Sequence, residues 1–166
     1  MENNIEKITR DQIATYLDIT PTASATWKII GIGVTAMGQE YNPQKTTEKW
    51  IIHKNATTTT DSYQISTSVS QSCYKGDPVF EFVNKIRREA GVGSKCATHI
   101  LDIDMWDATG EGVNKSFKAT KYSGNIAITK YNDENAVIEY DLDYNGDPEL
   151  GTVTFADGVP TFTPEV

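Results

Sequence analysis

Hydrophobic and polar residues alternate along most of this chain with the two-residue period of β-strands. Val, Ile, Thr and Tyr are frequent in the alternating stretches, as is usual for strands. Ser123-Gly124 is a plausible tight turn between two such stretches. The predicted strands cover residues 13–19, 26–33, 50–54, 62–70, 96–106, 115–122, 125–131, 136–144 and 151–155.

Residues 76–91, GDPVFEFVNKIRREAG, depart from this alternation and predict one α-helix over about 77–90. Asp77 can accept a hydrogen bond from the first free amides, Pro78 suits the first helical position, and Gly91 suits a left-handed residue at the end. Apolar side chains recur at three- and four-residue steps. They are Val79, Phe82, Val83, Ile86 and Ala90. We expect this stripe, with Val83 and Ile86 at its centre, to cover a sheet.

The stretch between the predicted strands 26–33 and 50–54 is polar and contains Gly38 and Asn42-Pro43. It predicts a β-hairpin with a long connecting loop at about 34–47. Loops of this length without secondary structure of their own are uncommon in compact domains and are often functional. This loop is therefore a candidate interaction segment.

Two predicted strands each carry a polar row opposite an apolar row. The first row is uncharged and the second is acidic. The uncharged row is Gln64, Ser66, Ser68 and Ser70. The acidic row is Glu139, Asp141 and Asp143.

Length and composition predict a single domain, 1–166, with short arms at about 1–12 and 156–166. Asp and Glu outnumber Lys and Arg by 23 to 15, which gives a net charge of −8 and argues against gripping nucleic acid. No apolar run is long enough to span a bilayer, and the polar amino terminus predicts no Sec export. We therefore expect Cys73 and Cys96 to stay reduced.

No catalytic or metal-binding motif is complete, so the sequence predicts no enzyme, no metal and no cofactor. His53 and His99 lack the spacing of a metal site. Asp102, Asp104 and Asp107 are more simply explained as a solvated strand face. Residues 141–152 imitate the start of an EF-hand loop but have Thr152 where a bidentate glutamate is required.

The order of features over residues 24–106 resembles the major tail protein, or tail tube protein, of long-tailed bacteriophages of the siphophage type. The resemblance lies in a strand, TWKIIGIG, a long polar loop, the strand SYQISTSVS, the helix start Gly76-Asp77-Pro78-Val79-Phe80 and the aliphatic strand CATHILDIDMW. It implies a mainly β, sandwich- or barrel-like tail tube fold with one flanking helix.

The resemblance also implies a structural virion protein, made in the cytoplasm of a host bacterium, that forms stacked hexameric rings around a channel for DNA ejection. Its implied partners are other copies of itself, the tape measure protein, the tail terminator and distal tail proteins, with no membrane partner. The loop at 34–47 occupies the position that reaches a neighbouring ring, with Met37, Tyr41, Asn42 and Pro43 as its contact residues. Either polar row is a candidate channel lining, because a wall without cations lets DNA slide.

Two alternatives remain open at this point. One is the tube protein of a contractile tail, a tail-like bacteriocin or a type VI secretion system, which shares the ring arrangement. The other is a monomeric β-sandwich carbohydrate-binding module that uses Trp27, Trp50 or Trp106 as a stacking platform.

Overall fold

The computed structural model describes residues 5–166. Within this range the protein is mainly β, with one α-helix, and this confirms the predicted class. The strands are β1 (Ile13–Asp18), β2 (Trp27–Ile29), β3 (Gln39–Glu40), β4 (Pro43–Glu48), β5 (Thr57–Tyr63), β6 (Ser66–Ser72), β7 (Ala97–Thr109), β8 (Ser116–Asn132), β9 (Val137–Ala156) and β10 (Val159–Pro164). The helix is α1 (Pro78–Glu89), and 3₁₀ turns cover Arg10–Gln12, Gly93–Cys96 and Gly112–Asn114.

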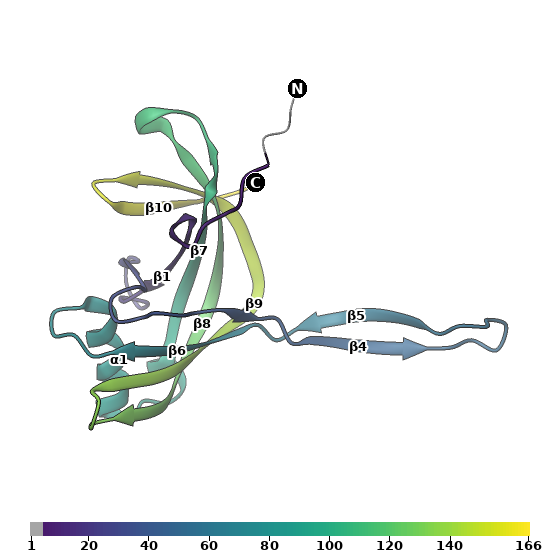
Figure 1. Ribbon diagram of the computed structural model, residues 1–166, viewed down its shortest axis with the longest axis horizontal. Helices are drawn as coiled ribbons and strands as arrows, with labels where there is room; N and C mark the ends of the chain where they lie inside the picture. The colour runs from purple at the N-terminus through teal and green to yellow at the C-terminus, as the bar shows by residue number, and fades with distance from the viewer. Residues whose placement is uncertain (1–4) are drawn as a thin grey trace.

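Eight strands form one antiparallel sheet in the order β2-β1-β7-β8-β9-β6-β3, with β10 paired to the carboxyl-terminal half of β9. Strands β4 and β5 form a separate two-stranded sheet that projects from this body (Figure 1). β9 is long enough to pair with β6 through residues 137–143 and with β10 through residues 151–156. The sheet therefore curls, and it encloses its apolar residues in a sandwich-like body.

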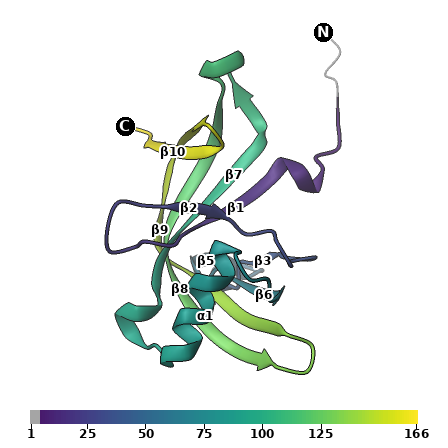
Figure 2. The same ribbon diagram turned by 90° about the vertical axis from the view of Figure 1, so that its left-hand side faces the viewer.

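The body has an apolar cluster on each face of the sheet. The larger one lies between the sheet and α1, which crosses the lower part of the body in Figure 2. Its most buried members are Leu17, Val69, Val79, Val83, Ile100, Ile126, Ile138, Tyr140 and Leu142. The smaller cluster lies on the opposite face and comprises Ala14, Leu101, Ile103, Phe117, Ala119 and Val153. Neighbours in β7, Ile100 and Leu101, belong to different clusters because successive side chains of a strand point to opposite faces.

The helix follows the prediction at its start and differs by one residue at its end. Asp77 accepts a hydrogen bond from the Phe80 amide at 3.1 Å, and Pro78 is the first helical residue. Val79, Val83 and Ile86 are buried, as the stripe predicts, whereas Ala90 is exposed. Ala90, not Gly91, adopts the left-handed conformation, with φ 45°, so the prediction for Gly91 was wrong.

Several strand predictions were wrong in their boundaries: the predicted strand 26–33 is shortened to β2, and the predicted strand 62–70 is divided between β5 and β6. Ser123-Gly124 is no turn, because β8 runs through it. Gly124 lies against Ile100, whose Cδ1 would be 2.8 Å from an added Cβ, so glycine marks close packing inside the strand. Residues 136–144 and 151–155 belong to the single strand β9, and the predicted carboxyl-terminal arm contains β10. Of the predicted amino-terminal arm, residues 1–4 lie outside the described residues.

The projecting hairpin is also displaced along the sequence from its prediction. The segment 50–54 is not a strand; it lies in the turn that joins β4 to β5. The strands of the hairpin are Pro43–Glu48 and Thr57–Tyr63, and the predicted loop at 34–47 contains β3 and most of β4. The polar residues Lys45, Thr46 and Thr47 of the predicted loop pair instead with β5 in a two-stranded ribbon.

Candidate functional site

The projecting hairpin, residues 43–63, is the most distinctive exposed feature of the molecule. Every residue of β4 and β5 is exposed. At its tip the side chains of Trp50, Ile51 and Ile52 have relative exposures of 63%, 102% and 79%. An isolated two-stranded hairpin is marginally stable in water, and an apolar group at its end favours contact with another surface. The hairpin therefore has the character of a binding element.

The root of the hairpin is held by contacts of residues that end or flank its two strands. The rings of Tyr41 and Tyr63 meet edge to face, with centroids 5.8 Å apart. Asn42 has a left-handed backbone, with φ 44°, and its side-chain amide donates to the Gln64 carbonyl at 3.0 Å. The chain thus turns out of the body at a defined position, and the direction of the hairpin is fixed at its base.

A partly buried carboxylate connects the segment before the hairpin to the body. Asp102 accepts hydrogen bonds from Thr15 Oγ1 at 2.8 Å and from Gln39 Nε2 at 2.5 Å. Gln39 Nε2 also approaches Tyr144 Oη at 3.1 Å. Burial raises the pKa of Asp102 to about 6; its two hydrogen bonds oppose this shift and the nearby Asp104 adds to it. Strands β1, β3 and β7 meet at this carboxylate, and Gln39 links it to Tyr144 of β9.

The residues predicted to make contacts from the loop lie at the root of the hairpin and not at its tip. Met37 packs against the larger apolar cluster of its own chain, while Tyr41, Asn42 and Pro43 lie where the ribbon leaves the body. Their role in contacts between copies stays a prediction. The tip residues were missed because WII was taken as a buried strand. The sequence pattern that could have indicated an exposed tip is the run KWIIHK, in which consecutive apolar residues lie between two lysines.

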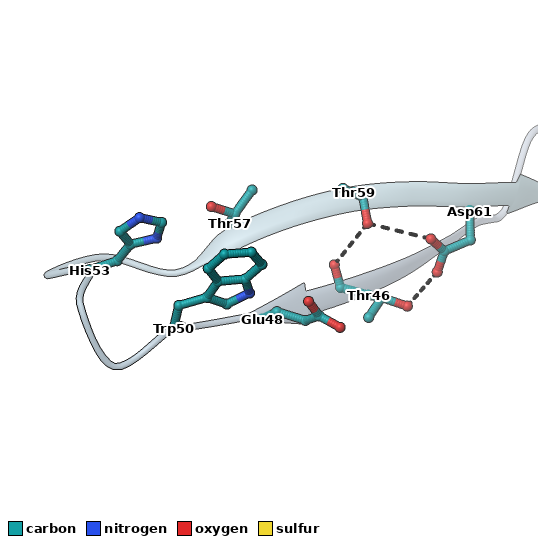
Figure 3. A pocket seen from close by; sticks show the side chains of 7 residues that line it. All are labelled: Thr46, Glu48, Trp50, His53, Thr57, Thr59 and Asp61. Atoms are coloured by element: carbon teal, nitrogen blue, oxygen red, sulfur yellow. Dashed lines mark hydrogen bonds between the residues drawn. The ribbon is translucent and has the colours of Figure 1, made fainter.

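The hairpin has two chemically different faces. One, which we call the carboxylate face, carries Thr46, Glu48, Trp50, His53, Thr57, Thr59 and Asp61 around a shallow hollow (Figure 3). The Trp50 and His53 rings stack there with an interplanar angle of 2°. The other, which we call the lysine face, carries Lys45, Thr47, Thr58 and Thr60, because strand residues alternate between faces.

The two predicted polar rows, described above as alternatives, lie side by side on one surface. The strand register pairs Ser66 with Asp143, Ser68 with Asp141 and Ser70 with Glu139. Ser68 Oγ donates to Asp141 Oδ1 at 2.7 Å. Asn125 of β8 extends this surface, and its side-chain amide donates to Asp143 Oδ2 at 3.2 Å. Gln64 is the exception, since it lies outside β6 at the hairpin root.

A buried polar network that the sequence did not reveal joins the start of α1 to the sheet. Gln71 Nε2 donates to Asp77 Oδ2 at 2.7 Å and to the Ile32 carbonyl at 3.0 Å. Tyr140 Oη donates to Gln71 Oε1 at 3.1 Å. Asp77 therefore does more than cap the helix, because it also fixes the helix to β6 and, through Gln71, to β9. Burial raises the pKa of Tyr140, which keeps its hydroxyl protonated as a donor.

The residues considered for chemistry do not gather into a catalytic or metal centre. No group of three metal-ligating side chains forms among residues 5–166. Asp107 pairs with Lys118 at 2.8 Å, and His99 pairs with the buried Asp18 at 3.1 Å. Cys73 and Cys96 are both free.

The tryptophans considered as a carbohydrate platform are dispersed. Trp27 packs against the smaller apolar cluster, whereas Trp50 lies at the hairpin tip. Trp106 is 45% exposed on β7.

The described part of the chain contains no helix with the length and hydropathy of a membrane span.

Comparisons with known proteins give matches in structure only. No protein-family model matches the sequence, and no curated protein matches it. One similar structure is from the tail of an empty GTA particle refined helically with C6 symmetry. It has a TM-score of 0.53 and 13% identity, over 90% of this chain and all of that chain. Another is from a six-fold symmetrised cryo-EM structure of the anti-feeding prophage (AFP) baseplate. Its TM-score is 0.45 with 6% identity, over 89% of this chain and 96% of that one. The first likeness shows that this chain has the fold of a chain found in a C6-symmetric tail.

Proposed function

We propose that this protein is a structural subunit of a phage-like tail, and that its copies form hexameric rings stacked into a tube. The observation that carries the proposal is the fold, which matches a chain of a C6-symmetric tail over 90% of its length. The fully exposed hairpin with its apolar tip supports it, because such a surface needs a partner. On this proposal the protein is not an enzyme and acts within a virion or a similar particle.

Ring formation gives a physical role to features that an isolated monomer does not need. Within residues 5–166 the order of strands ends at the short strands β2 and β3, and each of them pairs with one neighbouring strand only. Open sheet edges are sites of pairing between chains, and a closed ring of equivalent copies satisfies each edge with the next. The hairpin then reaches beyond the ring-forming body, toward a neighbouring copy.

We assign the polar surface on β6 and β9 to the wall of the channel. A row of serines on β6 lies beside a row of carboxylates on β9. The pairs are Ser66 with Asp143, Ser68 with Asp141 and Ser70 with Glu139. Duplex DNA carries about one negative charge per 1.7 Å of axis, so repeated cationic contacts would retain it. A wall of this composition lets DNA pass during ejection. Tape measure, terminator and distal tail proteins are the partners that such a tube requires.

Electron microscopy of the purified protein tests the proposal. Negative-stain images over a range of concentrations are expected to show hollow rings or tubes, and six-fold symmetry in averaged end views. Light scattering after size exclusion gives the mass of the same samples. A protein that stays monomeric at every concentration and binds glycans would contradict the proposal and favour a carbohydrate module. In an averaged tube, finding both polar rows on the outside would contradict the channel assignment.

A further inference from the structure

The two faces of the hairpin differ in charge and shape, and neither is covered by the rest of the chain. The carboxylate face bears Glu48 and Asp61, and the lysine face bears Lys45. Both strands are exposed throughout, so both faces are accessible in the monomer.

Only one of the two carboxylates is engaged within the hairpin. Asp61 receives hydrogen bonds from the hydroxyls of Thr46 and Thr59. Glu48 lies across the ribbon from Thr57, near the stacked Trp50 and His53 rings. Together they form a hollow with an aromatic wall and a negative rim, which suits an aliphatic stem that ends in an ammonium group.

The lysine face carries threonines and a single lysine. Two of its hydroxyls pair with each other, with Thr47 Oγ1 and Thr58 Oγ1 2.9 Å apart. Thr60 lies opposite Lys45 in the register, which leaves the lysine as the only charged group on this part of the ribbon. The positive charge of Lys45 on this face is complementary to the carboxylates of Glu48 and Asp61 on the other face.

We infer that the carboxylate face of one hairpin packs on the lysine face of the hairpin of a second copy. Identical copies arranged in a ring contact each other through two different surfaces, one on each side of the copy. A ribbon with two complementary faces supplies both surfaces in a single element. Lys45 of one copy then reaches Glu48 of the next, and the tip residues Trp50, Ile51 and Ile52 are covered by the same contact. This inference rests on the proposed self-assembly.

Thiol cross-linking with two single-cysteine substitutions distinguishes the two faces. Thr59→Cys marks the carboxylate face and Thr58→Cys marks the lysine face, and the residues are neighbours in β5. Each variant is assembled alone, and the two variants are also assembled together in equal amounts, with an affinity tag on one of them. All three samples are then treated with a short bismaleimide. We expect covalent dimers from the mixture and not from either variant alone. The unsubstituted protein, which keeps Cys73 and Cys96, is the control.

Charge exchange provides the second measurement. Lys45→Glu and Glu48→Lys are each expected to raise the protein concentration needed for assembly by about tenfold, since each places like charges in contact. The double exchange restores the pair and is expected to return assembly close to its original concentration. Glu134→Lys, on the exposed turn after β8, is the matched control, because it makes the same charge change away from the hairpin.

The outcomes separate this inference from the proposed function. Hairpin-to-hairpin packing would be overturned if tubes form normally, the single variants cross-link as well as the mixture, and the double exchange rescues nothing. The proposed tube would still stand in that case. Failure of the unsubstituted protein to assemble under any condition would count against the proposed function itself.

Discussion

The body and the hairpin of this protein use the same kind of strand for opposite purposes. In β6 and in residues 137–144 of β9 every second side chain is buried, and Val69, Ile138, Tyr140 and Leu142 form a core under α1. In β4 and β5 both faces are exposed and the apolar residues stand at the tip. Regular alternation therefore gives the body a buried apolar core, whereas the hairpin buries no residue on either of its faces. The comparison predicts that mutations in the two regions separate folding from assembly.

The largest effect is expected from Val83→Asp, in the centre of α1. Val83 is fully buried in the larger apolar cluster, and an unpaired carboxylate there has no partner. We expect a loss of about 4 kcal/mol or more in the free energy of unfolding, with loss of soluble rings. Urea unfolding followed by circular dichroism measures it. Lys85→Asp, on the exposed side of the same helix, is the control, and equal stabilities of the two variants would contradict the packing described.

A smaller effect is expected from Gly124→Val in β8. An added Cβ would lie 2.8 Å from Ile100 Cδ1 and 3.1 Å from Thr98 Cγ2, so the strand and its neighbour must shift. We expect a loss of about 1–3 kcal/mol, typical of overpacking. Gly38→Ala is the control, because no atom lies within 4 Å of the position of its added Cβ. Thermal unfolding of both variants tests the difference, and unchanged stability of Gly124→Val would show that this site is not tightly packed.

Asp102→Asn tests the link between body and hairpin through its pH dependence. The folded-state pKa of about 6 lies above the ordinary value of 3.8, so charged Asp102 costs stability above pH 6. This cost falls as the pH drops from about 6 to about 4, where the group becomes protonated in the folded state. We expect the variant to be more stable than the parent by about 1–3 kcal/mol at pH 7.5, with the difference vanishing near pH 4. Asp157→Asn, in the exposed turn after β9, should show no such trend.

The smallest effect on folding is expected from Ile51→Ser at the hairpin tip, and it should be accompanied by loss of assembly. Ile51 is fully exposed, so the free energy of unfolding of the monomer should change by less than about 0.5 kcal/mol. Val113→Ser removes a similarly exposed apolar side chain, 94% exposed, from a loop of the body. Only the tip variant should raise the concentration required for tubes in electron micrographs. Normal assembly by Ile51→Ser would remove the tip from the contact surface.

The sequence was most informative where local chemistry decides the structure. Asp77 and Pro78 specify the start of α1, and the alternation in residues 66–72 and 137–144 specifies which face of each strand is buried. Ser66, Ser68 and Ser70 share a surface with Glu139, Asp141 and Asp143, and this contact required the register. Gln64 lies outside β6, and the role of both rows stays a prediction. The hairpin was placed incorrectly because Trp50, Ile51 and Ile52 have the composition of a buried strand. Composition alone does not distinguish a strand from an exposed turn that carries apolar residues.

By itself, the sequence determined the β class, the single helix and its buried stripe, because these depend on the period of apolar residues and on capping groups a few residues apart. Only the tertiary structure decided that β8 continues through Gly124. It also decided that Asp102 accepts hydrogen bonds from Thr15 and Gln39, and that hydrogen bonds of Gln71 join Asp77 to Tyr140. These features bring together residues up to 87 positions apart, and that convergence is fixed by strand pairing across the whole sheet. The exposure of the hairpin is decided at the same level, because it depends on what the rest of the chain leaves uncovered.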